Sequence, residues 1–180
     1  TLILKTSCGN LYNYKGPVSI NMTGPTNKFI LIEGDMFDKK TISATARKYV
    51  QSQIETHPEI SFYYLKGNHD ADGFLNKLDE IPSNLFTFDE RWTKYTLATG
   101  SRELVLAGAE LSSFNSSTIY NDLFLEPKDF NIVMLHGQDS NYQSKDKAEV
   151  IGLGELKNKS IDYLALGHVH SYKMEALDGR

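Results

Sequence analysis

The sequence predicts a mixed α/β fold in which two sheets pack together and helices lie outside them. Three observations lead to this prediction: apolar runs that do not alternate, a helical segment between the first two of these runs, and a series of short β-like runs further along. An apolar run without alternation is typical of a strand buried on both faces. The 180 residues provide room for one compact domain with a single core.

The first half of the chain predicts a strand–helix–strand unit. Residues 29–34 and 61–65 are the expected buried strands, and residues 41–56 between them carry apolar side chains at helical spacing. The handedness rule for such a unit favours a parallel pair of strands. Residues 2–5 could form an additional strand, whereas the remainder of residues 1–28 is expected to be loop or irregular β structure.

The second half predicts a short helix over residues 73–80, followed by an antiparallel meander and a return to buried strands. The meander comprises residues 85–88, 94–97 and 103–109, with a hairpin turn at residues 98–101. The remaining expected elements are a buried strand at residues 131–135, a helix at 148–157 weakened by two glycines, a buried strand at 161–166 and a last strand within 172–177.

Composition limits the classes of function. The formal net charge of −4 gives no general attraction to nucleic acid or to an anionic membrane, although a local basic patch could exist. Cys8 is the single cysteine, so no intrachain disulfide is possible, and we expect a reducing compartment and a cytoplasmic protein. No apolar stretch approaches the roughly 18 residues that span a bilayer, and no signal peptide is recognisable. We therefore expect no membrane partner.

Residues that can bind metal gather at the ends of the predicted buried strands. In α/β proteins this is where a rigid scaffold meets loops that can reach a ligand. Carboxylate, amide oxygen and imidazole suit Mn²⁺, Mg²⁺, Fe or Zn²⁺ better than copper. The pattern therefore predicts a metal-dependent hydrolase. The residues concerned are Asp35, Asn68, His69, Asp70, His136, His168 and His170.

Phosphate ester hydrolysis gives these residues distinct roles. Two divalent cations about 3.5–4 Å apart clamp the attacking and leaving oxygens, with one carboxylate bridging them. His69 is then left for general acid catalysis or for stabilising transition-state charge, and Asp70 could accept from its ring and fix the tautomer. The ligands that this chemistry needs would be Asp35, Asn68, His136, His168 and His170.

Each motif alone has a structural alternative. A Gly-Asp dipeptide is usually a turn, and Asn68-His69-Asp70 could be a polar turn that closes a strand. His136 could be a hydrogen-bonded histidine at a strand end, and two histidines spaced by two lie on one face of a strand. The explanation that residue types able to bind metal occur at four strand ends by chance is much weaker than the structural alternative for any single motif. His57, before Pro58 at a predicted helix end, is interpreted as structural because a cationic histidine there favours the helix dipole.

Taken together, the motifs resemble four of the five motifs of the calcineurin-like metallophosphoesterases, in the family's order. They are Gly34-Asp35-Met36-Phe37-Asp38, Gly67-Asn68-His69-Asp70, His136-Gly137 and Gly167-His168-Val169-His170. The resemblance covers roughly residues 29–172, leaves residues 1–28 poorly matched and fits a single domain of residues 1–180. It implies a four-layer α/β/β/α sandwich of two mixed sheets, with a dinuclear metal site at the sheet ends.

The resemblance also implies a role for each residue. Asp35 would bridge the metals, His170 would bind one of them, and His69 would be the catalytic histidine with Asp70 beside it. Two divalent ions are expected, with Mn²⁺ preferred and Mg²⁺, Fe or Zn²⁺ as alternatives. The remaining ligands of the other metal would be Asn68, His136 and His168.

One family motif is missing. The family begins with Asp-x-His on its first strand, and the nearest positional match here places Cys8 and Asn10 at those two positions. A thiolate is soft and suits different ions. Two explanations stay open: the chain is a truncated or rearranged piece, incomplete at both ends, or its second metal site is incomplete.

The leading functional hypothesis is a metal-dependent phosphodiesterase that acts on DNA as an exonuclease or nuclease, because residues around the ligands look most like the DNA repair exonuclease branch. A phosphatase or phosphodiesterase of nucleotides or phosphoproteins is the second hypothesis, and an inactive scaffold with a degenerate metal site is the third. The sequence contains neither a phosphate-binding P-loop nor a Gly-x-Ser-x-Gly elbow. Oligomeric state is left open.

Overall fold

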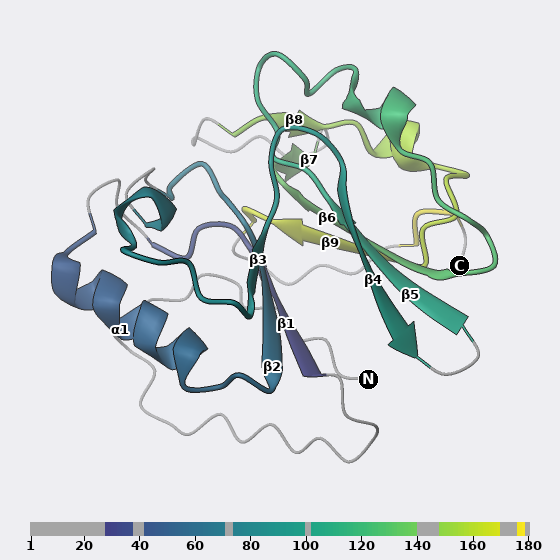
Figure 1. Ribbon diagram of the computed structural model, residues 1–180. Helices are drawn as coiled ribbons and strands as arrows, with labels where there is room; N and C mark the ends of the chain where they lie inside the picture. Colours follow the sequence, from purple (N-terminus) through teal and green to yellow (C-terminus); the bar gives the residue numbers. More distant parts are fainter. Residues whose placement is uncertain are drawn as a thin grey trace.

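Two sheets packed face to face form the centre of the molecule, and one α-helix lies on the outside of the first sheet (Figure 1). The computed structural model describes residues 28–37, 42–70, 74–99, 102–139, 148–169 and 176–178. Within these residues the predicted mixed α/β architecture with two sheets is confirmed. No helix in the described part of the chain is long and apolar enough to cross a membrane.

The first sheet contains the predicted strand–helix–strand unit. Strand β1 (Lys28–Glu33) pairs in parallel with β2 (Ile60–Leu65), and β2 pairs in parallel with β3 (Leu85–Thr87). Helix α1 (Ala44–Glu55) connects β1 to β2. The helix begins after Ser43 because the hydroxyl of this residue accepts a hydrogen bond from a backbone N–H in the first turn.

The second sheet has the strand order β4-β5-β6-β9. Its strands are β4 (Thr93–Thr99), β5 (Arg102–Gly108), β6 (Phe130–His136) and β9 (Tyr163–Gly167). The β4–β5 pair is antiparallel, as the hairpin prediction requires, and the β5–β6 and β6–β9 pairs are parallel. A short parallel pair, β7 (Gln138–Asp139) and β8 (Val150–Ile151), follows β6.

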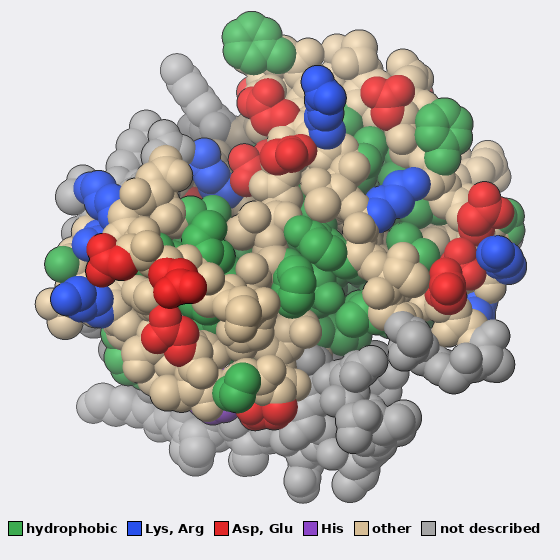
Figure 2. Space-filling view, in the orientation of Figure 1, with side chains coloured by type: hydrophobic (Ala, Val, Ile, Leu, Met, Phe, Trp, Pro, Cys, Tyr) green, Lys and Arg blue, Asp and Glu red, His purple; other side chains and the backbone are tan. Residues whose placement is uncertain are grey.

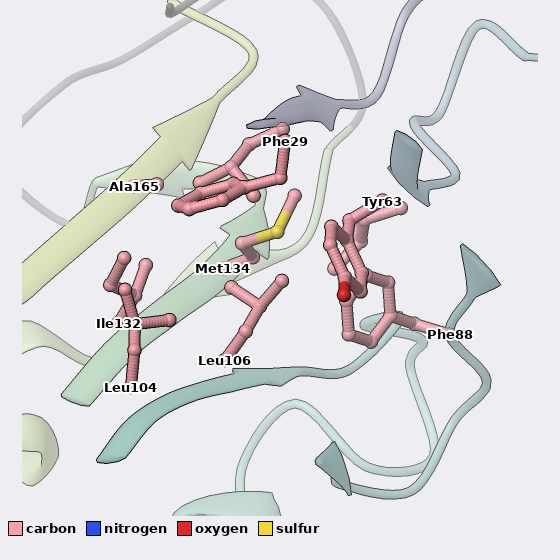
Figure 3. Close-up of a cluster of buried hydrophobic side chains, with 10 residues drawn as sticks. Phe29, Tyr63, Phe88, Leu104, Leu106, Ile132, Met134 and Ala165 are labelled. Carbon is pink, nitrogen blue, oxygen red and sulfur yellow. The ribbon is translucent and has the colours of Figure 1, made fainter. Parts of the chain in front are cut away.

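The main core lies between the two sheets, where alternate residues of β1 and β2 meet alternate residues of β5 and β6 (Figure 3). Helix α1 encloses a second cluster on the outer face of the first sheet. A third cluster lies under the 3₁₀ turns η2 (Ile119–Asp122) and η3 (Leu153–Leu156), on the outer face of the second sheet. The four layers of the expected sandwich are therefore present, but the described part of the fourth layer consists of 3₁₀ turns.

Two predicted helices are wrong. The segment at residues 73–80 contains only the 3₁₀ turn η1 (Leu75–Lys77) among its described residues, and the chain is extended again at Leu78. A segment this short cannot sustain a helix without tertiary support. Residues 148–157 contain β8 and η3, because glycines disfavour a continuous helix there and Val150–Ile151 pairs with β7.

The predicted meander is also wrong in one strand, since β3 belongs to the first sheet and runs parallel to β2. Asn84 explains this placement. Its side-chain amide donates to carbonyl oxygens of Ile54, His57 and Ile60 at 2.9, 3.0 and 3.0 Å, which fixes the start of β3 beside the end of α1 and the start of β2. The strand expected at residues 2–5 and most of that within 172–177 lie outside the described residues.

Candidate metal centre

The predicted ligands follow the carboxyl ends of four strands, two from each sheet. In the first sheet Glu33 is in register with Leu65, so the segments that begin at Gly34 and Lys66 leave the sheet side by side. In the second sheet His136 is in register with Gly167, so His168 follows directly beside His136. Because the sheets pack face to face, all four strand ends meet at one edge of the sandwich.

Four of the five predicted ligands come together there. His136 Nε2 lies 2.8 Å from Asn68 Oδ1 and 3.3 Å from Asp35 Oδ2. His168 Nδ1 lies 3.2 Å from the same Asn68 Oδ1. One ligand atom from each of Asp35, His136 and His168 falls within 4.8 Å of the others, as binding of a single ion requires. His170, the fifth, lies outside the described residues.

The donor set fits a divalent cation. His136 Nδ1 is 2.7 Å from the carbonyl oxygen of Glu33, to which its N–H donates. The opposite nitrogen, Nε2, then presents its lone pair to Asn68 Oδ1 and Asp35 Oδ2. Three electron-rich atoms that face one another need a positive charge between them. A backbone carbonyl behind the ring is also the usual device for orienting a metal-binding histidine.

The pKa values express the same electrostatic arrangement. Burial alone would raise the pKa of Asp35, but hydrogen bonding and charge attraction from His136, together with His69, lower it below its ordinary value. Burial alone would lower the pKa of His136, but the Asp35 carboxylate raises it. The site therefore favours an ionised carboxylate and a positive charge beside it. A bound cation would replace the proton as the source of that charge.

Hydrogen bonds from backbone N–H groups hold the ligand loops in place. Asp70 Oδ2 accepts from Gly67 N at 2.9 Å and Oδ1 accepts from Phe37 N at 3.0 Å, which joins the loop after β2 to the loop after β1. Burial nevertheless raises the pKa of Asp70. Asp35 Oδ1 accepts from His69 N at 2.9 Å. The carboxylates of Asp35 and Asp70 thus position the segment that carries Asn68 and His69.

Glycines let the strand ends approach this closely. A Cβ at Gly67 would overlap Asp35, and a Cβ at Gly167 would overlap the carbonyl oxygen of Glu33. Gly34 has φ 80°, in the left-handed region, and a Cβ there would overlap His136 Nδ1. Sequence reasoning found these glycines as parts of motifs but missed their packing role, and it missed the Glu33 carbonyl group entirely. The sequence feature that could have indicated this close packing is the glycine beside each strand end that carries a ligand.

The other predicted site residues are placed as follows. His69 is half-buried beside Asp35, and its assignment as catalytic histidine stays a prediction, as does the assignment of Asp70 to its ring. Cys8 and Asn10 lie outside the described residues. His57 is exposed at the end of α1, where its Nδ1 lies 2.7 Å from the carbonyl oxygen of Gln53, in agreement with a structural role.

Comparison with known proteins decides the family. Residues 13–172 match the model of the calcineurin-like phosphoesterases. The chain belongs to this family. It is also 32% identical over 150 residues to the uncharacterized metallophosphoesterase YhaO of Bacillus subtilis (strain 168), a match that covers 79% of this chain and 36% of YhaO. The chain therefore spans about a third of the length of that relative.

Calcineurin-like phosphoesterases are divalent-metal-dependent, which agrees with the cluster of Asp35, His136 and His168. The match with the family begins at residue 13. It therefore includes part of the segment that sequence reasoning left poorly matched.

Proposed function

We propose that this calcineurin-like phosphoesterase hydrolyses phosphodiester bonds with two divalent metal ions and acts on DNA as an exonuclease or nuclease. The observation that carries the proposal is the convergence of Asp35, Asn68, His136 and His168 at one edge of the sandwich. A preserved ligand cluster supports an enzyme over an inactive scaffold. Residues around the ligands support the DNA branch, because Gly34–Asp38 and the run from Tyr163 to His170 resemble its motifs.

The proposed roles combine the contacts of the described residues with the resemblance to the family. Asp35, Asn68, His136 and His168 would hold the ions together with His170, and the bound ions supply charge neutralisation on the phosphoryl oxygens and a more acidic water. His69 would protonate the leaving oxygen or stabilise the negative charge that develops on the phosphoryl group. Its backbone N–H donates to Asp35, which fixes it beside the ligands. Among metals, Mn²⁺ is the preferred candidate, with Mg²⁺, Fe and Zn²⁺ as alternatives.

The net charge of −4 favours a second candidate function, a phosphatase or phosphodiesterase of nucleotides or phosphoproteins. Proteins that bind duplex DNA gain much of their affinity from Lys and Arg contacts with phosphates. An acidic chain gains little from such contacts. The second candidate uses the same site and chemistry, so the two differ only in the substrate that reaches the metals.

The test compares three substrates with the chain as purified, after chelation and after metal re-addition. The substrates are end-labelled linear DNA, a small aryl phosphodiester and a nucleoside monophosphate. We expect EDTA to abolish hydrolysis and Mn²⁺ to restore it. His136→Ala should lose both metal and activity, whereas His57→Ala, which alters an exposed histidine at the end of α1, should match the parent.

Two results would redirect the proposal. Full activity in EDTA would contradict metal catalysis. Hydrolysis of the aryl diester without release of nucleotides from DNA would instead favour the second candidate.

A further inference from the structure

Tyr64 lies on the middle strand of the first sheet, and its hydroxyl reaches the loop that follows this strand. On β2 it is in register with Ile32 of β1 and with Thr87 of β3. Its ring is 2% exposed and packs in the cluster under α1, where its centroid lies 5.9 Å from that of Phe74. The hydroxyl forms a hydrogen bond with the carboxylate of Asp70, which is also buried. This buried contact lies only two residues from a predicted ligand in the chain.

Burial and charge make the Tyr64 hydroxyl the donor in this bond. Burial, together with the negative charge of Asp70, raises the pKa of Tyr64, so the hydroxyl keeps its proton at neutral pH. Burial also raises the pKa of Asp70, whereas hydrogen bonds from Gly67, Phe37 and Tyr64 lower it. A buried carboxylate is stable only with such donors, because burying a charge without partners is costly.

The Asp70 carboxylate joins the two loops that carry ligands of the first sheet. Its oxygens accept from Gly67 N and Phe37 N at 2.9 and 3.0 Å. Gly67 directly precedes the ligand Asn68. Phe37 follows the ligand Asp35 by two residues. The tyrosine hydroxyl is a third donor to this carboxylate, and it comes from the middle strand of a sheet and not from a loop.

We propose that Tyr64 is a positioning residue for the metal centre, whose hydroxyl, acting through Asp70, fixes the spacing between the loops that carry Asp35 and Asn68. The inference rests on the proposed function and adds a residue that acts on the metal ligands without binding metal. Removing a group that orients a ligand directly changes metal affinity about 10- to 100-fold. Because Tyr64 acts through an intermediate residue, we expect a change of about 10-fold, at the lower end of that range.

Tyr64 does not act by touching substrate, because its side chain is enclosed under α1. The charged groups that a phosphodiester meets on its approach lie on the surface instead. On the face shown in Figure 2, Lys and Arg side chains of the described residues are scattered among Asp and Glu. Loss of the tyrosine hydroxyl should therefore change metal affinity and leave KM for substrate unchanged.

Tyr63 provides a matched control. It directly precedes Tyr64 on β2, is 3% exposed, and belongs to the core between the sheets instead of the cluster under α1 (Figure 3). Its hydroxyl shares a hydrogen bond with Ser61 on the same strand. Tyr63→Phe and Tyr64→Phe each remove one hydroxyl from a buried ring of β2 and keep the ring. They differ because only Tyr64→Phe removes a donor to Asp70.

The experiment titrates Mn²⁺ into the metal-free parent and variants by isothermal titration calorimetry and records thermal unfolding in EDTA. Tyr64→Phe should bind Mn²⁺ about 10-fold more weakly than the parent. Tyr63→Phe should match the parent in Mn²⁺ affinity, even where the two variants lose similar amounts of stability. Asp70→Asn, which replaces one acceptor oxygen by an amide donor, should weaken Mn²⁺ binding at least as much as Tyr64→Phe. With saturating Mn²⁺, Tyr64→Phe should keep the parent's KM for a small aryl phosphodiester.

Unchanged Mn²⁺ affinity in Tyr64→Phe would overturn the inference, as would equal losses in Tyr64→Phe and Tyr63→Phe. Parental affinity in Asp70→Asn would also overturn it, because the carboxylate would then not hold the ligand loops together. Failure of the proposed function is a separate result, in which the parent binds Mn²⁺ but does not hydrolyse the aryl phosphodiester. The Mn²⁺ titration decides the role of Tyr64 in that case too.

Discussion

Replacing Gly67 with alanine tests whether the metal centre depends on close contact between strand ends. The added Cβ would overlap the backbone nitrogen and Oδ1 of Asp35, and it would lie 2.9 Å from His136 Cε1. Asp35 cannot avoid this overlap by a side-chain rotation, because its backbone is involved. The end of β1 or of β2 must therefore move. Overpacking of this kind typically costs about 1–3 kcal/mol.

The expected effects concern both stability and metal binding. A loss of 1–3 kcal/mol corresponds to a Tm lower by roughly 2–12 °C, because 1 kcal/mol shifts the Tm of a domain of this size by about 2–4 °C. Metal affinity should also fall, since the movement separates Asp35 Oδ2 from His136 Nε2 and Asn68 Oδ1. Thermal unfolding followed by circular dichroism and titration with Mn²⁺ measure the two effects.

Gly154→Ala is the matched control, because a Cβ at that glycine meets nothing within 4 Å. It should leave Mn²⁺ affinity unchanged and change the Tm little. If Gly67→Ala gave the same Tm and the same Mn²⁺ affinity as Gly154→Ala, close packing of the strand ends would not determine the site geometry. The reasoning from glycine positions to ligand positions would then be refuted.

Four other variants test three separate parts of the argument. His69→Ala should retain metal but lower turnover ~10²–10⁴-fold, as expected for general acid catalysis. Asp35→Ala should instead lose both metal and turnover. Loss of metal in His69→Ala would contradict the catalytic role assigned to His69. Asn84→Ala should reduce the free energy of unfolding in urea by about 1–3 kcal/mol, because three carbonyl oxygens lose their donor, and an unchanged value would mean that water replaces the amide. Burial raises the pKa of Glu110, which lies beside Lys66, Asp89 and Glu90. The folded state therefore retains the Glu110 proton to a higher pH than the unfolded state does. As a result, the free energy of unfolding falls as pH rises through the folded pKa. Glu110→Gln removes that fall, so its stability relative to the parent should increase between pH 4 and 7 in urea unfolding, and a pH-independent difference would show that Glu110 does not titrate in this range.

The strand–helix–strand unit and the positions of the ligands were predictable because both depend on local pattern. A non-alternating apolar run followed by a polar ligand specifies a buried strand and its carboxyl end. Parallel pairing then places the ends of β1 and β2, and of β6 and β9, at the same edge. Strand pairing, together with the face-to-face packing of the two sheets, therefore brings the ligands into one cluster.

The errors arose where tertiary contacts decide the structure. Strand β3 has only three residues, too few to reveal which sheet it joins, and the amide of Asn84 makes that choice through three distant carbonyl groups. Residues 148–157 are apolar enough for either a helix or a strand. Their path depends on pairing with β7 and on Tyr120, whose hydroxyl accepts from Gly152 N at 2.8 Å. Such partners cannot be seen in a local pattern.

His168 shows how the site departs from simple strand geometry. Along β9, Ala165 belongs to the core between the sheets, and Leu164 and Leu166 pack on the outer cluster. Continued alternation would place His168 on the outer side, away from Asn68. Instead its φ of 101° breaks the alternation, and its Nδ1 lies 3.2 Å from Asn68 Oδ1.

A residue other than glycine in this conformation costs on the order of 1–3 kcal/mol and persists only where other interactions offset the strain. The contact between His168 and Asn68 is exposed, and a hydrogen bond of this kind contributes only about 0.5–1.5 kcal/mol. A cation held jointly by His168, Asn68 and the buried pair of Asp35 and His136 would add to this stabilisation. The left-handed backbone of His168 therefore explains how its ring reaches the ligand cluster. The argument for metal binding is the cluster itself, because Asn158 and Ser160 also have positive φ away from the site.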